Sequence, residues 1–295
     1  MKVVISDNVI PEVLELIKGT GAEVVYKPEP LEPALADADV LVIRSATKVT
    51  PELLSIAKNL KMVIRGGVGL DNVDKEECKK LGIVVANTPG ASTNAVAEFA
   101  LALILSTVRN IPRASSSMKE SKWEKKQLAG TEVHGKVLGL IGCGRIGCAL
   151  GEKASHLGMK IIGYNPPPRH ECTFIEYVNS LEELFKRADI ISLHVPATPE
   201  TKNMINAKTI SQMKDGVIIV NSARGTIIDE DALYEACKSG KIRAAALDVY
   251  SQEPYTGKLN ELENTILTPH IAASTSEAQT RIGEEIAKKI RELMA

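Results

Sequence analysis

The stretch from Val137 to Gly147 constrains the fold of this chain more than any other. Val137 to Ile141 is an apolar run short enough for a buried parallel strand, and glycines follow at 142, 144 and 147 in the spacing G-x-G-x-x-G. In this pattern the first glycine permits a tight turn, and the second lets a pyrophosphate approach backbone N–H groups. The third lets a helix pack closely on the strand, and the helix N-terminus faces the anion. The stretch therefore predicts a strand, a phosphate-binding turn and a helix.

The residues after this turn favour dinucleotide binding over a turn that serves packing alone. Residues 145–157 are typical of a crossover helix, and Met159 to Tyr164 of a second buried strand. The position expected to hold the adenosine ribose, about 20 residues on, is usually acidic, but here it is Asn165. An asparagine can still hydrogen-bond a ribose hydroxyl, although it carries no charge. The pattern therefore predicts dinucleotide binding and leaves open which dinucleotide is preferred.

Composition and length limit the class of protein. A chain of 295 residues with 44% hydrophobic residues can bury a full core and divide into two domains. A formal net charge of -1 gives no general attraction for nucleic acid or for an anionic membrane. No apolar run approaches membrane-spanning length, and residues 1–5 are typical of a strand rather than a signal peptide. We therefore expect a cytoplasmic protein with no nucleic-acid or membrane partner.

The cysteines indicate no disulfide framework and no metal site. The five of them form no C-x-x-C pair and are odd in number, which favours reduced thiols over a disulfide or zinc framework. They occupy positions 78, 143, 148, 172 and 237.

Short β-branched runs alternate with helix candidates over the first ninety or so residues. Buried runs separated by helices imply a doubly wound parallel sheet, which binds ligands at the carboxyl ends of its strands. Arg44 and Arg65 follow the third and fourth runs beside small residues or backbone amides, which suits a small anionic ligand. One such arginine alone would more simply be solvated, but two at the same sheet edge favour a site. The strands are expected at 3–5, 24–26, 40–43, 62–64 and 83–85, with helices near 11–18, 31–36, 51–57 and 74–81.

The composition changes from Thr93 onward. Residues 94–105 are apolar nearly all round, which predicts a helix buried between layers or at an interface. Residues 113–126 are polar and hold the one tryptophan, Trp123, so this segment is either a mobile solvated arm or a subunit contact. Buried runs return at 190–193, 217–221, 244–247 and 266–267, which predicts a second doubly wound sheet, and an amphipathic stretch at 274–294 is expected to cross back to the first domain.

Six stretches spread over nearly the whole chain resemble the D-2-hydroxyacid dehydrogenase family, in the order that the family has them. They are Arg-Ser-Ala-Thr-Lys-Val-Thr at 44–50, Gly-Leu-Asp-Asn-Val-Asp at 69–74, Gly-Cys-Gly-Arg-Ile-Gly at 142–147, Asn-Ser-Ala-Arg-Gly at 221–225, Ala-Leu-Asp-Val-Tyr at 246–250 and Thr-Pro-His-Ile-Ala-Ala-Ser-Thr at 268–275. The resemblance implies an α/β protein of two doubly wound parallel-sheet domains. A Rossmann-type NAD-binding domain, 94–273, would be inserted in a flavodoxin-like substrate domain formed by 1–93 and 274–295.

The resemblance also implies a catalytic set of Arg224, Glu253 and His270. Oxidation of a secondary alcohol needs a base for the hydroxyl proton while hydride leaves for nicotinamide, and histidine titrates in the right range. A carboxylate on the other ring nitrogen fixes the tautomer and stabilises the imidazolium, which would be the role of Glu253. Arg224 would grip the substrate carboxylate. Without the family, His270 after a proline and Glu253 before one would be ordinary loop and turn residues.

Further positions match cofactor and substrate contacts of the family. Asp248 is one of them and would face the nicotinamide carboxamide, with helix capping as its alternative. The expected cofactor contacts are Val68, Gly142, Gly144, Arg145, Ile146, Gly147, Asn165, Val195, Ser222, Ala223, Asp248, Ala272 and Ala273. The expected substrate contacts are Arg44, Arg65, Gly67, Val68, Arg224 and His270, with Lys125 or Lys126 arriving from a second subunit.

These residues lead to one expected reaction and two alternatives. The expected reaction is NAD-dependent oxidation of D-3-phosphoglycerate to 3-phosphohydroxypyruvate, the first step of serine biosynthesis, by a homodimer. Because the chain ends at Ala295, we expect the short form without C-terminal regulatory domains. The alternatives are a glyoxylate or hydroxypyruvate reductase on the same scaffold and a corepressor-like protein that senses NAD.

Overall fold

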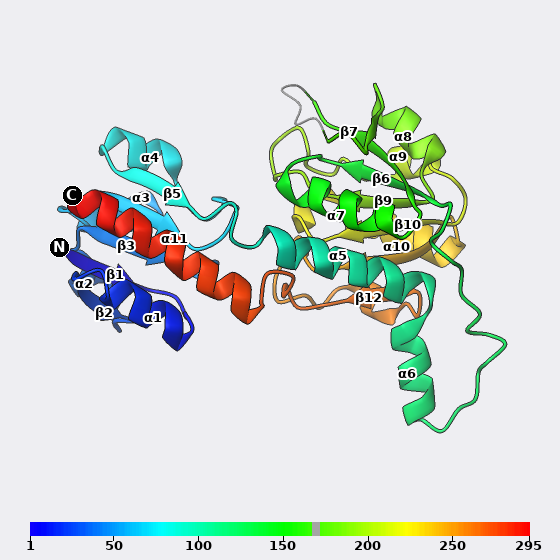
Figure 1. The fold of residues 1–295 in the computed structure, drawn as a ribbon, viewed down its shortest axis with the longest axis horizontal. Helices are drawn as coiled ribbons and strands as arrows, with labels where there is room; N and C mark the ends of the chain where they lie inside the picture. Colours follow the sequence, from blue (N-terminus) through cyan, green and yellow to red (C-terminus); the bar gives the residue numbers. More distant parts are fainter. Residues whose placement is uncertain (167–171) are drawn as a thin grey trace. The chain divides into compact units, whose positions relative to one another are not determined.

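The computed structural model describes residues 1–166 and 172–295, which form two compact units (Figure 1). Unit 1 comprises residues 1–93 and 273–295, and unit 2 comprises residues 94–272. Each unit has its own sheet, and every strand pairing in both sheets is parallel over the described residues. The predicted fold class, two parallel-sheet α/β domains, is confirmed.

Unit 1 has the strand order β2-β1-β3-β4-β5, which is the flavodoxin-like order. Side chains cap three of its helices: Thr50 accepts from Leu53 N, Asp74 from Glu77 N and Thr275 from Ala278 N. The strands are β1 (Lys2–Ile5), β2 (Glu23–Tyr26), β3 (Val40–Ile43), β4 (Met62–Arg65) and β5 (Val84–Asn87), and the helices are α1 (Pro11–Lys18), α2 (Leu31–Leu35), α3 (Pro51–Ile56), α4 (Lys75–Lys80) and α11 (Ser276–Met294).

Both faces of the sheet in unit 1 are buried, because alternate residues of each strand point to opposite faces. Val3 and Ile5 pack with residues of α1 and α11 in one apolar cluster, whereas Val4 packs on the other side with residues of α2, α3 and α4. Figure 1 shows α11, in red, lying along the same side of the sheet as α1. The last helix of the chain therefore completes the core of the first unit, as the amphipathic pattern of 274–294 predicts.

Unit 2 has a sheet of order β12-β11-β10-β9-β6-β7-β8, in which β6 lies between β9 and β7, as the first strand of a Rossmann-type sheet does. The strands are β6 (Val137–Ile141), β7 (Lys160–Tyr164), β8 (Glu176–Tyr177), β9 (Ile190–Leu193), β10 (Val217–Asn221), β11 (Ile242–Leu247) and β12 (Thr265–Leu267). The helices are α5 (Thr93–Val108), α6 (Ile111–Lys119), α7 (Arg145–His156), α8 (Leu181–Arg187), α9 (Ala207–Ser211) and α10 (Glu230–Ser239). The two short 3-10 helices are η1 (Gly225–Ile227) and η2 (Lys258–Glu261).

Helices cover both faces of this sheet as well. One apolar cluster joins the strands to α5 and α7, and the other joins them to α8, α9 and α10. The α5 helix buries Ala97, Ala100 and Ile104 completely, so the prediction of a buried helix from its apolar composition is confirmed.

The segment after α5 contains a helix that the sequence pattern does not predict. Residues 111–119 form α6, which Asn110 precedes in a left-handed conformation with φ of 54°. Figure 1 shows α6 extending away from the sheet of unit 2. Ile111 and Met118 on this helix are exposed, and Trp123 beyond it is 78% exposed. At least half of each of these three apolar side chains is therefore open to solvent.

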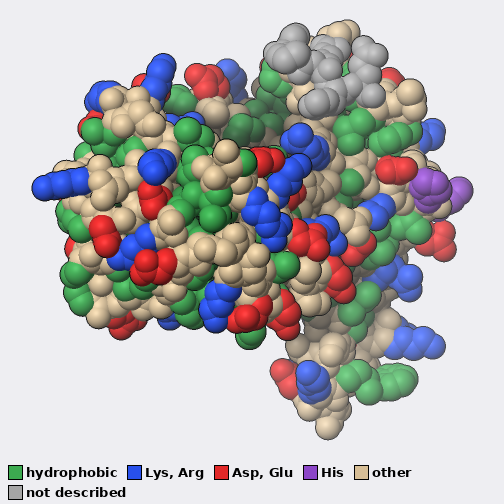
Figure 2. All heavy atoms as spheres, turned by 60° about the vertical axis from the view of Figure 1, so that its left-hand side comes forward, with side chains coloured by type: hydrophobic (Ala, Val, Ile, Leu, Met, Phe, Trp, Pro, Cys, Tyr) green, Lys and Arg blue, Asp and Glu red, His purple; other side chains and the backbone are tan. Residues whose placement is uncertain are grey.

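Two surface properties bear on the sequence predictions. Lysine and arginine side chains are interspersed with acidic ones on the face that Figure 2 shows, which accords with the net charge of -1. Among the described residues, no single helix has the length and apolar composition to cross a membrane. The bent pair of α5 and α6 passes that test only when taken together, with 63° between its halves.

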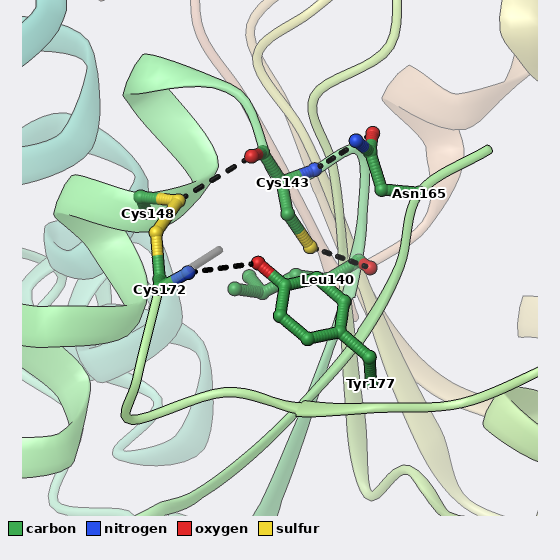
Figure 3. The surroundings of a disulfide bond; sticks show 6 residues. All are labelled: Leu140, Cys143, Cys148, Asn165, Cys172 and Tyr177. Carbon is green, nitrogen blue, oxygen red and sulfur yellow. Dashed lines mark hydrogen bonds between the residues drawn. A yellow bond between two sulfur atoms is a disulfide. The ribbon is translucent and has the colours of Figure 1, made fainter. Parts of the chain in front are cut away.

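The prediction of reduced thiols is wrong for two of the five cysteines. Cys148 on α7 and Cys172 before β8 form a disulfide, with their Cα atoms 6.4 Å apart (Figure 3). The Tyr177 hydroxyl accepts a hydrogen bond from Cys172 N at 3.2 Å and holds this end of the link. Cys78, Cys143 and Cys237 are free and buried. The two cysteines are 24 residues apart, and no local sequence pattern indicates that they pair. They meet because the segment before β8 packs against α7.

The disulfide makes a prediction about stability. Replacing both cysteines, with Cys148→Ser and Cys172→Ser, should lower the free energy of unfolding of unit 2 by about 3 kcal/mol, because the link restricts the unfolded chain. Urea unfolding followed by circular dichroism measures the change. Dithiothreitol should shift the transition of the unsubstituted protein and leave that of the double variant in place. An equal response of both proteins to the reductant would contradict a disulfide in solution.

Candidate active site

Each glycine of the turn after β6 has its own structural role. Gly142 has φ of 96°, and a Cβ there would lie 2.7 Å from the backbone carbon of His194. A Cβ on Gly147 would overlap the carbonyl oxygen of Gly142, so the helix lies against the turn. A Cβ on Gly144 would meet nothing within 4 Å, which leaves open space in front of the first turn of α7. The turn is thus a cradle that fits a pyrophosphate at a helix N-terminus.

Asn165 lies beside this turn, just after β7. Its side-chain oxygen accepts a hydrogen bond from Cys143 N at 3.3 Å (Figure 3). The side chain therefore touches the turn itself. His194, which follows β9, lies under the same turn, and burial lowers the pKa of its ring to about 4. Its Nε2 lies 2.9 Å from Ser192 Oγ, so a neutral ring supports the glycine turn from below.

The loop after β10 is held by its own polar groups. The Asn221 side chain accepts from Ala223 N at 3.0 Å and donates to Arg224 O at 2.9 Å. The Ser222 hydroxyl is buried without a hydrogen-bond partner among the described residues. Because a buried unpaired hydroxyl is costly, it marks a place where a bound ligand can supply the missing partner. A side chain on Gly225 would overlap the backbone of Tyr250, so the two loops are in close contact.

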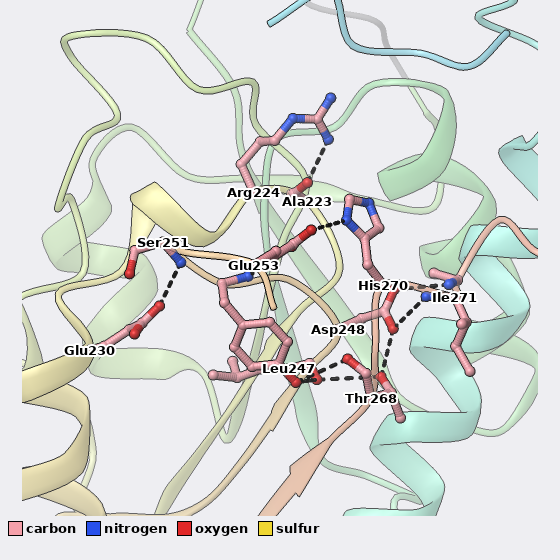
Figure 4. A network of polar contacts seen from close by, with 12 residues as sticks. Ala223, Arg224, Glu230, Leu247, Asp248, Ser251, Glu253, Thr268, His270 and Ile271 are labelled. Carbon is pink, nitrogen blue, oxygen red and sulfur yellow. Dashed lines mark hydrogen bonds and ion pairs between the residues drawn. The ribbon is translucent and has the colours of Figure 1, made fainter. Parts of the chain in front are cut away.

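Asp248, at the end of β11, anchors the next loop rather than facing outward. It is 0% exposed, and its carboxylate accepts from Ile271 N at 2.9 Å and Ala272 N at 2.8 Å. It also accepts from the Thr268 hydroxyl at 2.6 Å (Figure 4). Charge-assisted hydrogen bonds of this kind are short and strong. One buried carboxylate therefore fixes the backbone on both sides of His270.

His270 and Glu253 form a direct pair. His270 Nδ1 lies 2.9 Å from Glu253 Oε2, and the side chains are 42% and 40% exposed (Figure 4). The second carboxylate oxygen of Glu253 accepts from Tyr250 N at 3.2 Å, which fixes its orientation. His270 has φ of 55°, a left-handed conformation that costs energy for a histidine and is held here by the loop that Asp248 anchors. Nδ1 carries the proton toward the carboxylate, so Nε2 is left for a reacting group.

A cavity of about 530 Å³ borders this pair. Tyr250 and Tyr255 stack on one another in its wall, with ring centroids 4.3 Å apart. Burial raises the pKa of Tyr250 to about 12, and its hydroxyl donates to Thr268 O at 2.9 Å. The phenol is therefore neutral at neutral pH and donates a hydrogen bond to the backbone of the loop before His270.

Arg44 and Arg65 leave the sheet of unit 1 at the same edge. Ile43 and Arg65 are register partners on β3 and β4, so the next residue along β3, Arg44, begins the loop beside Arg65. The Arg44 guanidinium donates to Gln279 Oε1 at 2.6 Å, and burial lowers its pKa from the usual value. The Arg65 guanidinium lies over Gly67, where a Cβ would overlap it. The predicted pair of cations at one edge of the sheet is therefore present.

The other predicted contacts fall into four groups. Val195 and Ala223 lie in the same wall as the glycine turn and the loop after β10, because all follow carboxyl ends of unit 2 strands. Val68 is exposed next to Gly67 in unit 1, and Ala273 belongs to unit 1. Lys125 and Lys126 are exposed in the segment after α6 and have no ion pair in the described part of the chain. Arg145 and Ile146 form the first turn of α7.

Three residues near these positions carry no sequence motif of their own. Asp7, Asn72 and Gln279 contact Arg44 or the loop that it begins. Asn72 lies inside a stretch of family resemblance, but resemblance alone assigns it no contact. Asp7 follows β1 at the carboxyl edge of the sheet, which is the one sequence signal that points to it.

Comparisons with known proteins identify the family. The profile of the D-isomer specific 2-hydroxyacid dehydrogenase NAD-binding domain matches residues 101–272. This chain belongs to the D-isomer specific 2-hydroxyacid dehydrogenases, a family of enzymes, and NAD is the cofactor of the matched domain.

Relatives within the family have different substrates in their names. Hydroxypyruvate reductase of Thermotoga maritima is 54% identical over 260 residues, which cover 87% of this chain and 85% of that protein. D-3-phosphoglycerate dehydrogenase of Methanocaldococcus jannaschii is 46% identical over 302 residues, which cover 100% of this chain and 57% of that protein. This chain thus spans just over half the length of that relative. The structure of Aquifex aeolicus D-lactate dehydrogenase with NAD and lactic acid matches with a TM-score of 0.88 at 33% identity, covering 100% of this chain and 95% of that one.

The anchoring of the His270 loop can be tested at Asp248. Asp248→Asn places an NH2 group against one of two backbone amides in a buried site, which should misplace His270 and lower kcat by about 10²-fold. The matched control is Asp229→Asn, since Asp229 also accepts from a backbone amide in unit 2 but caps α10. The control should keep its kcat, and steady-state kinetics compares the two. Equal kcat values would mean that the loop keeps its place without the carboxylate.

Proposed function

We propose that this protein is a phosphoglycerate dehydrogenase, which oxidises D-3-phosphoglycerate to 3-phosphohydroxypyruvate with NAD. The observation that carries the proposal is the pair of arginines at one edge of the unit 1 sheet, Arg44 and Arg65, since a phosphate needs several cationic partners. Relatives that bear this name and are 43–46% identical to the chain support it. Residues 1–93 with the returning C-terminal helix would then bind substrate, and the inserted unit would bind NAD.

The His270–Glu253 pair is the proposed acid and base. Bound NAD supplies a hydride acceptor at its nicotinamide ring. His270 takes the C2 hydroxyl proton at Nε2, and its Nδ1–H stays hydrogen-bonded to Glu253, whose charge stabilises the imidazolium. Arg224 binds the substrate carboxylate as a fork and steadies the C2 oxygen. Amides near Gly67 and Val68 complete the carboxylate site. In the reverse direction His270 returns the proton to the keto oxygen.

The proposed NAD site follows the carboxyl edge of the unit 2 sheet. The glycine turn with Arg145 and Ile146 would hold the pyrophosphate, and Asn165 the adenosine ribose. The unpaired hydroxyl of Ser222 supports a contact with the nicotinamide half. Val195, Ala223, Ala272 and Ala273 would line the same site through backbone or methyl groups. Asp248 would act mainly through the loop that it anchors.

We further propose a homodimer in which α6 and the segment after it contact a second subunit. The exposed Ile111, Met118 and Trp123 support this, because a solvated arm gains nothing from apolar side chains. Lys125 or Lys126 would then reach the neighbouring substrate.

The second candidate is hydroxypyruvate reductase, on a substrate that lacks the phosphate. The 54% identity with the Thermotoga maritima enzyme favours it, and the two reactions need the same His270, Glu253 and Arg224. Only the cations at the edge of unit 1 distinguish the two. A fold shared by enzymes of many substrates does not decide between them.

The first prediction of the proposed function concerns the role of His270. His270→Gln should lower kcat by about 10²- to 10⁴-fold, because general base catalysis contributes that much. NADH binding, measured by fluorescence titration, should be nearly unchanged, and Glu253→Gln should have a smaller effect on kcat. The matched control is His156→Gln, since His156 is an exposed histidine on α7 whose ring lies 2.8 Å from Glu152 O of the same helix. A kcat of the His270 variant close to that of the control would remove His270 from the mechanism.

The choice of substrate makes the second prediction. Arg44→Ala should raise KM for phosphohydroxypyruvate about 10- to 100-fold more than KM for hydroxypyruvate, because a charged hydrogen bond to phosphate is lost. Lys61→Ala is the control, since Lys61 is a cation in the same unit that pairs with Asp39. Initial rates with both keto acids measure the ratio. An equal change for both substrates would favour hydroxypyruvate reductase.

A further inference from the structure

The loop that begins with Arg44 is held from below by one buried carboxylate. Asp7 follows β1, and its side chain is buried, at 6% exposed. Its carboxylate accepts from Arg44 N at 2.6 Å and from Thr47 N at 3.1 Å. It also accepts from the Thr47 hydroxyl at 2.5 Å. Because these donors lie at the two ends of a four-residue loop, Asp7 fixes both ends at once.

A second side chain holds the opposite side of the same loop. Asn72 donates through one amide nitrogen to Arg44 O at 2.8 Å and to Thr47 O at 2.6 Å. The backbone of Asn72 also accepts from Val49 N at 2.8 Å, so it is itself tied to the chain just beyond the loop. Asp7 therefore accepts hydrogen bonds from the N–H groups of Arg44 and Thr47, and Asn72 donates to the carbonyl groups of the same two residues. We call this arrangement of Asp7 and Asn72 the loop clamp.

The loop clamp leaves the middle of the loop open. Ser45 and Ala46 are exposed, and their N–H groups have no hydrogen-bond partner in the described residues. The Arg44 side chain turns back to Gln279 on α11, which in turn donates to Ala273 O at 3.1 Å. Both the cation and the two free amides at this edge thus depend on backbone that the clamp fixes. Free amides beside an arginine form a preorganised site for a phosphate oxygen.

We infer that Asp7 and Asn72 are positioning residues that set substrate selectivity, because they hold the loop 44–47 in the one conformation that presents Arg44 and two free amides to a substrate phosphate. The inference rests on the proposed function. Neither residue needs to touch the substrate. An acceptor-only carboxylate on one side and a donating amide on the other match the polarity of the four backbone groups, so the roles of the two side chains cannot be exchanged.

The test uses variants that keep the size of each side chain and change only its polarity. Asp7→Asn and Asn72→Asp are made in the full chain, with Arg44→Ala beside them. The matched control is Asp39→Asn, because Asp39 also accepts from a backbone amide, that of Lys2, but lies before β3 at the other end of the same sheet. The measurements are KM and kcat for phosphohydroxypyruvate and hydroxypyruvate, and the inhibition constant of inorganic phosphate against hydroxypyruvate reduction.

We expect both clamp variants to raise KM for phosphohydroxypyruvate about tenfold more than KM for hydroxypyruvate, as the loss of one well-placed charged hydrogen bond would. The inhibition constant of phosphate should rise by a similar factor, and kcat should change much less. The control should change none of these ratios. If Asp7→Asn does not fold, Asn72→Ala on the more exposed side of the loop gives the same comparison, with folding checked by circular dichroism.

Two outcomes would overturn the inference, and they differ. If Arg44→Ala loses selectivity while both clamp variants affect the two substrates equally, the clamp has only a structural role and the proposed function stands. If Arg44→Ala also affects both substrates equally and phosphate does not inhibit, no phosphate site exists at this edge. The inference then fails together with the proposed function.

Discussion

The parallel arrangement of every strand is the constraint on which the rest of this structure depends. In a parallel sheet all strands end at the same edge, so residues that are far apart in sequence follow one another around a single rim. In unit 2 the glycine turn follows β6, Ser222 follows β10 and Asp248 follows β11. In unit 1 Arg44 and Arg65 follow β3 and β4. Each sheet therefore brings these polar groups to one edge, although the groups are far apart in the sequence.

At both edges a buried carboxylate fixes a loop that carries a more accessible side chain, His270 in unit 2 and Arg44 in unit 1. Asp248 accepts hydrogen bonds from two backbone amides and a hydroxyl near His270. Asp7 likewise accepts from two backbone amides and a hydroxyl in the loop that begins with Arg44. A carboxylate suits this task because it only accepts and can bind several amides at once. Loops have little stability of their own, so such anchors give them the precision that catalysis requires. The buried carboxylates thus fix the backbone from which His270 and Arg44 extend.

The family membership and the substrate rest on different kinds of observation. Family membership follows from long stretches of sequence and from the fold, which respond to many residues at once. In the proposed function, substrate choice depends on a few charges around one loop, and these contribute little to the overall sequence identity. A relative at 54% identity and another at 46% accordingly carry different substrates in their names. The charges of Arg44 and Arg65 therefore bear on the proposed substrate more directly than the percentage of sequence identity does.

By itself the sequence determined the fold class, the places of most strands and the glycine turn. These features depend on local patterns, such as the buried run before Gly142 and the alternation of strands and helices before Thr93. It left α6 and the two-residue β8 unpredicted, because the polar segment after α5 shows no clear helical pattern and a strand of two residues has no periodicity.

Only the tertiary structure decided the contacts between distant residues. It paired Cys148 with Cys172, placed the Asp248 carboxylate against the backbone amide of Ile271, and brought Asp7 to Arg44. In each case the partners lie between 23 and 37 positions apart. Such pairs meet because strands and helices lie side by side after folding. No local pattern records that proximity, which is the physical reason why these contacts had to come from the structure.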